Sequence, residues 1–135
     1  MLEHVAIWTK DLEVMKEFYC HFLSGQAGEK YTSSSEFHSE FESYFLTFGS
    51  GSRLELMHMP TIPEGINANG YEAIGLTHIA FSVKTKEDVN AMAKKANDMG
   101  CPIILEPHQT GDGYYEMCIL DPEGNRVEVT VLPQS

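Results

Sequence analysis

Residues 2–10 read LEHVAIWTK, and residues 76–84 read LTHIAFSVK. The two stretches share Leu, His, Ala and Lys at equivalent positions, and their histidines stand 74 residues apart (78 − 4 = 74). A second match lies at nearly the same spacing: residues 51–57 read GSRLELM and residues 124–130 read GNRVEVT, with Gly, Arg and Glu in common. Two separate matches at almost one spacing indicate an internal repeat. The sequence therefore predicts that one module occurs twice.

Both copies show the same order of predicted elements, a strand, a helix and three further strands. The helices are assigned from apolar residues at helical spacing, which are Leu12, Met15, Phe18, Tyr19 and Phe22 in the first copy and Val89, Met92, Ala93, Ala96 and Met99 in the second. Asp11 and Thr85 are their expected N-caps, the latter in a capping box with Asp88, and Gly25 and Gly100 are expected to end them. The predicted strands are 2–9, 27–33, 41–48 and 52–59, then 76–83, 102–106, 113–120 and 125–132.

This order predicts an α+β fold of tandem βαβββ modules, whose sheets curve around one open cleft. Residues 1–135 are expected to form a single domain built from two repeats, about 1–59 and 76–132. Residues 60–75 are rich in Pro, Gly and Asn, and are predicted to be the linker between the repeats.

Composition narrows the class of protein. Nine basic residues stand against 20 acidic ones, so the net charge is −11, spread evenly along the chain. That charge disfavours nucleic acid or an anionic membrane as a partner, because both repel it at long range. Three scattered cysteines form no disulfide framework or thiolate zinc motif, and the first residues do not resemble a signal peptide. We therefore expect a protein of the reducing cytoplasm.

The first and last strands of each module place one type of side chain on a shared face. Because side chains alternate along a strand, His4, Glu55, His78 and Glu128 all lie opposite the branched apolar residues that pack under the helices. Two imidazoles and two carboxylates on one sheet face are explained by a divalent cation such as Zn, Ni, Co, Mn or Fe(II). The alternatives are a hydrogen-bonded core histidine, and a glutamate that is solvated or paired with Arg53 or Arg126. Recurrence of the His and Glu in both copies favours the metal site.

These features resemble the vicinal oxygen chelate superfamily (glyoxalase, bleomycin resistance and extradiol dioxygenase proteins), over essentially residues 2–131. The most specific segments are THIAFSV at 77–83 and DPEGNRVEV at 121–129. Within the superfamily, the His/Glu/His/Glu set is similar to that of glyoxalase I (lactoylglutathione lyase). Methylmalonyl-CoA epimerases are also similar, but usually carry Gln at the position of Glu55, and the metal-free bleomycin-binding relatives lack the ligand set.

The resemblance implies a metal-dependent lyase or isomerase with His4, Glu55, His78 and Glu128 as ligands of Ni, Co or Zn. It implies that Glu128 is the catalytic base, with Glu55 as its near-symmetric counterpart. The reaction converts a hemithioacetal, or a related adduct of a small carbonyl compound and a thiol, through an enediolate. The resemblance further implies a homodimer with its sites at the subunit interface.

Two positions depart from the glutathione-using glyoxalases. Trp8 stands where those enzymes carry an Arg that grips a glutathione carboxylate, and Met59 stands roughly where they carry an Asn. With Met57 these side chains predict an apolar substrate-binding mouth, or alternatively side chains that simply fill the barrel. His38 and His108 are expected at its edge or on the surface. The substrate is therefore open: it could be another thiol adduct, a CoA thioester or a small hydroxy-carbonyl compound. The alternative functions are an acyl-CoA epimerase and a non-catalytic binding protein.

Overall fold

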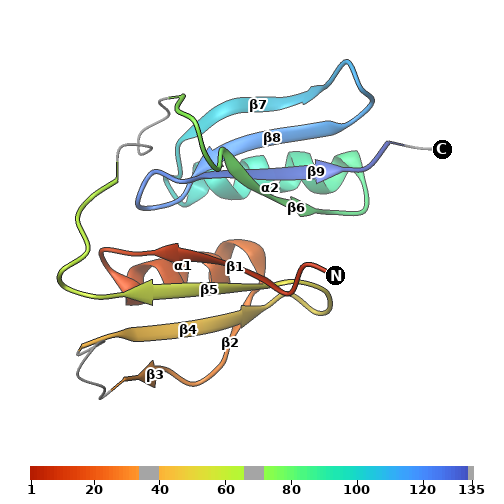
Figure 1. Ribbon diagram of the computed structural model, residues 1–135. Coiled ribbons are helices and arrows are strands. Elements are labelled where there is room, and N and C mark those ends of the chain that lie inside the picture. Colours follow the sequence, from red (N-terminus) through yellow and green to blue (C-terminus); the bar gives the residue numbers. More distant parts are fainter. Residues whose placement is uncertain (34–39, 66–71, 134–135) are drawn as a thin grey trace. The chain divides into compact units, whose positions relative to one another are not determined.

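A computed structural model describes residues 1–33, 40–65 and 72–133 of the chain. The chain divides into two compact units, Met1–Gly65 (unit 1) and Ile66–Ser135 (unit 2), and each is described by itself. In each unit one helix packs against one face of one sheet (Figure 1). The face of a sheet away from its own helix is called the open face below.

Unit 1 consists of β1 (His4–Trp8), α1 (Leu12–Leu23), β2 (Gln26–Ala27), β3 (Tyr31–Thr32), β4 (Glu42–Thr47) and β5 (Arg53–His58). The sheet order is β1-β5-β4-β2, and β3 also pairs with β4. β1 and β5 are parallel, whereas β4 and β5 are antiparallel. The first and last strands of the module are therefore neighbours. The strand predicted over 27–33 is in fact two short strands.

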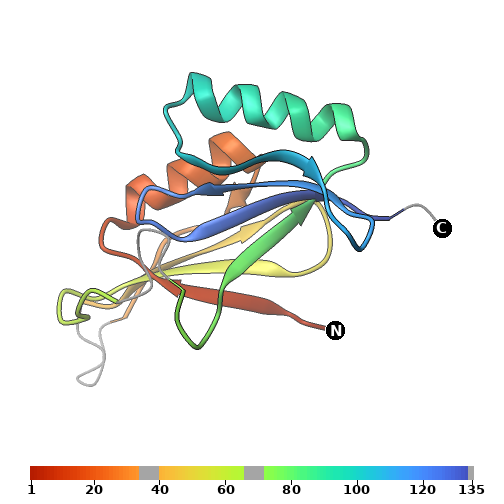
Figure 2. The same ribbon diagram turned by 90° about the horizontal axis from the view of Figure 1, so that it is seen from above.

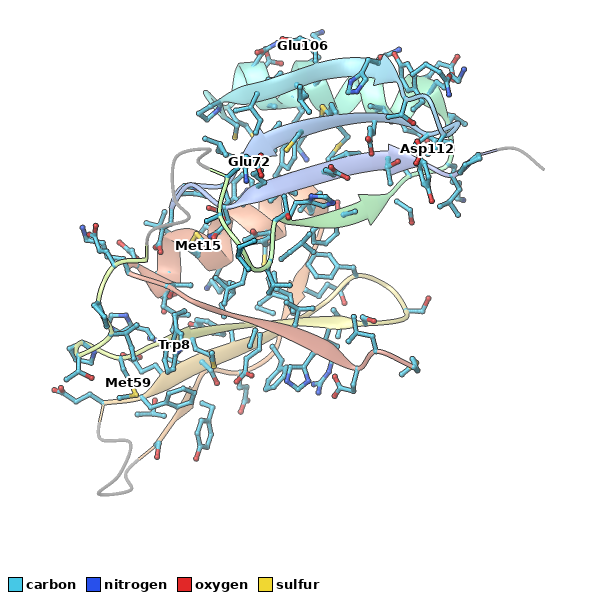
Figure 3. The ribbon with its side chains drawn as sticks, turned by 45° about the horizontal axis from the view of Figure 1, so that its top comes forward. Trp8, Met15, Met59, Glu72, Glu106 and Asp112 are labelled. Carbon is cyan, nitrogen blue, oxygen red and sulfur yellow. The ribbon has the colours of Figure 1, made fainter. Side chains whose placement is uncertain are left out.

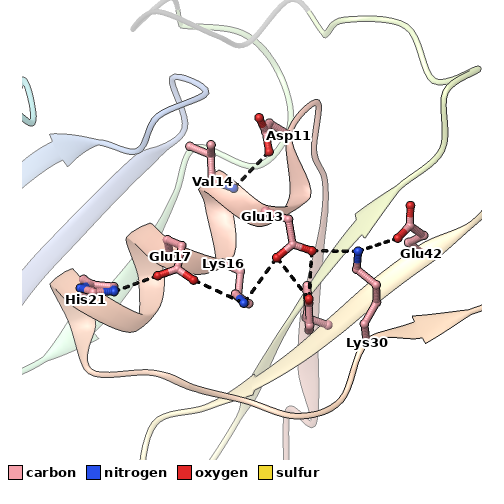
Figure 4. Close-up of polar contacts among 9 residues, drawn as sticks. Asp11, Glu13, Val14, Lys16, Glu17, His21, Lys30 and Glu42 are labelled. Atoms are coloured by element: carbon pink, nitrogen blue, oxygen red, sulfur yellow. Dashed lines mark hydrogen bonds and ion pairs between the residues drawn. The ribbon is translucent and has the colours of Figure 1, made fainter.

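Helix α1 begins where the sequence predicts. The side chain of its N-cap Asp11 accepts a hydrogen bond from the backbone N–H of Val14 at 3.1 Å (Figure 4). All five predicted core positions are buried: Leu12, Met15, Phe18, Tyr19 and Phe22. Met15 is labelled in Figure 3. These side chains, together with Leu46, Leu54 and Leu56 of the sheet, form the core of unit 1.

The end of α1 differs from the prediction in one detail. Ser24, not Gly25, takes the left-handed conformation, with φ 58°. Gly25 is needed for a different reason, since a Cβ there would lie 2.8 Å from Cε1 of the Phe48 ring. The glycine therefore permits a close approach and is not the helix-ending residue.

Unit 2 consists of β6 (His78–Ser82), α2 (Lys86–Asp98), β7 (Ile103–Gln109), β8 (Tyr115–Leu120) and β9 (Arg126–Val131). The sheet order is β6-β9-β8-β7, with β6 and β9 parallel and the other pairs antiparallel. Figure 2 shows α2 running along one face of this sheet. Unit 2 thus repeats the arrangement of unit 1, and the predicted α+β class is confirmed.

Helix α2 has the predicted capping box. The Thr85 hydroxyl accepts a hydrogen bond from the Asp88 N–H at 3.1 Å, and the Asp88 carboxylate accepts one from the Thr85 N–H at 3.0 Å. Val89, Ala93 and Ala96 are buried, as predicted. Met99 is 43% exposed, so its predicted place in the core is wrong: it is the C-cap of the helix, beyond the last buried turn.

A buried aspartate organises the turn between β8 and β9. The Asp121 carboxylate accepts hydrogen bonds from the backbone N–H groups of Glu123 (2.9 Å) and Asn125 (3.0 Å), and from the Asn125 side chain (2.8 Å). Gly124 adopts φ +87°, a conformation that favours glycine. This turn sets where β9 begins, and so where the side chains of β9 lie against β8.

None of the helices in the described parts of the chain has the length and apolar character needed to cross a bilayer.

Candidate functional site

The strand pairing of unit 1 brings the first predicted histidine and glutamate together. β1 and β5 are in parallel register with Ala6 opposite Glu55, so that His4 and Glu55 lie on the open face of neighbouring strands. The His4 Nε2 atom is 3.7 Å from Glu55 Oε1. Leu54 and Leu56 lie on the opposite face and are buried, as the alternation predicts.

Neighbouring groups orient His4. Its Nδ1 atom is 3.0 Å from Glu3 Oε2, and its ring meets the Phe45 ring edge to face, with centroids 5.3 Å apart. Because a carboxylate can only accept, Nδ1 is the donor in this contact, and Nε2 is presented toward Glu55. A carboxylate on the far nitrogen is also what fixes the tautomer of many metal-binding histidines.

Arg53 is engaged elsewhere. Its guanidinium hydrogen-bonds the Glu3 carboxylate and lies over the Phe45 ring, 4.2 Å from the centroid. It acts on Glu55 only through longer-range attraction. Arg53 therefore does not neutralise Glu55 by a direct hydrogen bond, as the alternative interpretation would require.

Unit 2 contains the equivalent pair. Ala80 of β6 lies opposite Glu128 of β9, and His78 Nε2 is 3.2 Å from Glu128 Oε1. The Glu128 side chain is only 18% exposed. Arg126 forms an ion pair with Glu72 at 3.1 Å.

The environment of Glu128 favours its protonated form. Burial raises the pKa of this carboxyl above its usual range; His78 opposes the shift, and the neighbouring Glu116 carboxyl, which shares a hydrogen bond with Glu128, adds to it. A carboxylate in such a place is held in its charged form most readily by a cation.

The three predicted substrate-binding residues lie in unit 1. Trp8 and Met57 are opposite each other on β1 and β5, and Figure 3 shows Trp8 and Met59 at the same end of this sheet. The Trp8 side chain is 42% exposed and meets the Phe41 ring edge to face, with centroids 6.0 Å apart. Phe41 also contacts Tyr31. The open face of unit 1 is thus aromatic and apolar at this end.

The structure adds residues that the sequence reasoning did not assign to the site. Glu116 of β8 lies on the same face as Glu128, and His108 of β7 lies opposite Glu116. Alternation within β8 could have placed Glu116 on one of two faces, but only the pairing register shows that it is the face of Glu128. His108 was expected near the edge of the site, and its charge does act on Glu128. His38 lies outside the described residues.

Each unit therefore supplies one imidazole nitrogen and one carboxylate oxygen from adjacent parallel strands. Across residues 1–33, 40–65 and 72–133, no cluster of three or more His, Cys, Asp or Glu side chains is gathered closely enough to hold a metal ion. The donor atoms themselves, nitrogen and oxygen in equal number, are those that Zn, Ni and Co accept. The donor chemistry and the Glu3–His4 contact fit a divalent cation.

Comparison with known proteins agrees with this architecture. The protein YqjT of Bacillus subtilis (strain 168) is 25% identical over 132 residues, which cover 95% of this chain and 96% of that protein. A glyoxalase family protein from Bacillus cereus has a TM-score of 0.82 at 17% identity, covering 98% of this chain and 94% of its own. The lactoylglutathione lyase of Agrobacterium tumefaciens has a TM-score of 0.67 at 21% identity, covering 97% and 92%. These structural likenesses confirm the predicted glyoxalase-like fold.

The sequence profile of one family matches residues 1–129, nearly the whole chain and both repeats. The resemblance drawn from the repeated histidine and glutamate is confirmed at the level of the superfamily: the chain belongs to the Glyoxalase/Bleomycin resistance protein/Dioxygenase superfamily.

Proposed function

We propose that this protein is a metal-dependent lyase or isomerase of the glyoxalase I type. Its substrate is a hemithioacetal, or a related adduct of a small carbonyl compound and a thiol. The observation that carries the proposal is the repeated His–Glu pair, with nitrogen–oxygen distances of 3.7 Å for His4–Glu55 and 3.2 Å for His78–Glu128. Both pairs stand at equivalent positions on the first and last strands of their modules.

The reaction is a proton transfer between adjacent carbons. Glu128 removes the proton from the carbon that bears sulfur, which leaves an enediolate, and the proton is then returned to the neighbouring carbon to give a thioester. No oxidant or reductant is needed. The partly buried Glu128 suits the base, since a carboxyl with a raised pKa binds a proton more strongly than an exposed one. Glu55 is its counterpart in unit 1.

The proposal assigns His4, Glu55, His78 and Glu128 as the four protein ligands of the cation, which is Ni, Co or Zn. When bound, the cation supplies Lewis-acid stabilisation of negative charge on the substrate oxygens. Trp8, Met57 and Met59 bind the apolar part of the substrate. We further propose that the protein acts as a homodimer with its sites at the subunit interface.

The test begins with metal-stripped protein reloaded separately with nickel, cobalt and zinc. Metal content is measured by mass spectrometry, and thioester formation from methylglyoxal with glutathione is followed in the ultraviolet. We expect metal-dependent thioester formation that Glu128→Gln lowers by roughly 10²-fold or more. His21→Ala is the matched control, because His21 is an exposed helix residue paired with Glu17.

The outcomes separate the alternatives. If metal-loaded protein is inactive with glutathione but active with other thiols, the proposed reaction stands and its thiol is not glutathione. Exchange of the α-proton of an acyl-CoA instead of thioester formation identifies an epimerase. Protein that takes up none of the three metals contradicts the proposal and favours a binding protein without turnover.

A further inference from the structure

The two open faces differ beside their His–Glu pairs. In unit 2, strand pairing lines up four hydrogen-bonding side chains across the whole sheet, and we call them the polar row: His108, Glu116, Thr130 and Ser82. The equivalent positions of unit 1 hold Tyr31, Ser43, Met57 and Trp8, which are mostly aromatic or apolar. The two units therefore share a fold, but the same positions of their open faces are polar in unit 2 and mostly aromatic or apolar in unit 1.

One member of the polar row, Thr130, has a hydroxyl group without a hydrogen-bond partner within the described part of the chain. Its side chain lies between Glu116 and Ser82 on the open face, while its neighbours Val129 and Val131 are buried on the helix side. Thr130 is 6% exposed, and its Oγ1 is the one buried side-chain oxygen or nitrogen in the described residues that has no hydrogen-bond partner. Such an orphaned hydroxyl costs free energy unless something satisfies it.

The other members of the polar row mainly offer acceptors. His108 Nδ1 is 2.7 Å from the Glu106 carbonyl oxygen and donates there, so that Nε2 is an acceptor when the ring is neutral. Glu116 shares a hydrogen bond with Glu128 through its carboxyl group, and its other oxygen is an acceptor. The Thr130 and Ser82 hydroxyls can accept as well as donate.

We infer that the polar row binds a hydrogen-bond-donating group of the substrate, a hydroxyl or a primary ammonium, and disfavours a carboxylate there. This inference rests on the proposed function and names the kind of substrate that the site takes. The row stands two residues along β9 from Glu128 and on the same face, so the bound group lies beside the proposed base. The net charge of −11 acts in the same direction, against an anionic ligand.

The experiment uses three small thioethers that differ only at one end: 2-(methylthio)ethylamine, 2-(methylthio)ethanol and 3-(methylthio)propionate. Each is titrated into isotope-labelled, metal-free protein, and binding is read from the amide signals of β8 and β9. We expect the amine to bind roughly threefold to fivefold more tightly than the carboxylate, the size of one partly exposed ion pair. The alcohol is expected to bind between the two.

Three variants test the residues. Glu116→Gln should remove the preference for the amine, and Glu116→Lys should reverse the order in favour of the carboxylate. Thr130→Val should weaken binding of the alcohol while leaving the unliganded protein as stable as before or more so, because it deletes an unsatisfied hydroxyl. Glu87→Gln makes the same charge change as Glu116→Gln, but on α2, over the other face of the sheet, and should leave the order unchanged.

Equal affinity for the three thioethers, or the same order in Glu116→Lys, overturns the inference. Failure of the proposed function is seen separately, in metal uptake and thioester formation. Protein that isomerises hemithioacetals but shows no preference among the thioethers loses only this inference.

Discussion

At the scale of single residues, one glutamate connects the helix of unit 1 to its sheet. Glu13 accepts a hydrogen bond from the Tyr44 hydroxyl at 2.9 Å and pairs with Lys30 at 2.8 Å and Lys16 at 3.4 Å (Figure 4). Lys30 also pairs with Glu42 at 2.8 Å. The contacts run from α1 to β4 and to the segment between β2 and β3, so they fix the helix on the sheet that carries Glu55.

The stability that Glu13 contributes should depend on pH. The Lys30 ammonium is the main cause that lowers the pKa of this carboxyl below 4.5, with help from Tyr44 and against the opposing effect of burial. A carboxyl whose pKa is lower in the folded state stabilises the fold at neutral pH, and this contribution is lost as the pH falls through the folded-state pKa. We expect Glu13→Gln to cost about 0.5–1 kcal/mol near pH 7.

Urea unfolding of the Glu13→Gln variant and the wild type checks this expectation, measured near pH 7 and well below pH 4.5, where the carboxyl is protonated in the folded state as well. The difference in free energy of unfolding should shrink toward zero in acid. Glu29→Gln, an equal charge change at an exposed site, should cost less. A difference that is the same at both pH values would show that the charge of Glu13 is not what matters.

At the scale of elements, the capping box of α2 fixes where the helix starts directly after β6, the strand of His78. Thr85→Ala removes the side-chain acceptor of the Asp88 N–H and should lower the free energy of unfolding by about 1 kcal/mol. Thr85→Ser keeps an acceptor and should retain most of the stability. Hydrogen exchange at the Asp88 amide is the local readout. Equal exchange in the Ala and Ser variants would contradict a capping role.

Local sequence signals predicted the elements well where one residue decides the outcome. Asp11 and Thr85 cap their helices as expected, and alternation in the first and last strands placed each His and Glu on one face. The predictions failed where packing decides. Ser24 rather than Gly25 takes the left-handed position, and Gly25 instead allows the close approach of Phe48. Met99 lies beyond the buried turn of its helix.

Part of the site could not be predicted from the sequence because it depends on the register between two strands. Glu116 stands beside Glu128 only because Cys118 is opposite Glu128 in the β8–β9 register. The Asp121 turn sets that register, and a shift of one residue would move every side chain of β9 to the other face. Spacing along one strand does not contain this information.

At the scale of the whole molecule, the proposal requires both repeats for one cation. Zinc at about a hundred times its dissociation constant should then stabilise the wild type by about 2.7 kcal/mol, and chelation should reverse the effect. His4→Ala and His78→Ala should each abolish most of the stabilisation, although the residues lie in different units. Thermal unfolding with and without zinc checks this, with His21→Ala as the control. Full stabilisation in either variant would show that one pair suffices.

The parallel pairing of β1 with β5, and of β6 with β9, also bears on how the protein is made. In each unit the first strand to leave the ribosome finds its partner only when the last strand has been synthesised. Until then Val5 and Ile7, or Ile79 and Phe81, sit on a strand whose edge is open to other chains. Such distant pairing slows folding. A nascent chain of this protein is therefore expected to depend on chaperones most in the interval before each module is complete.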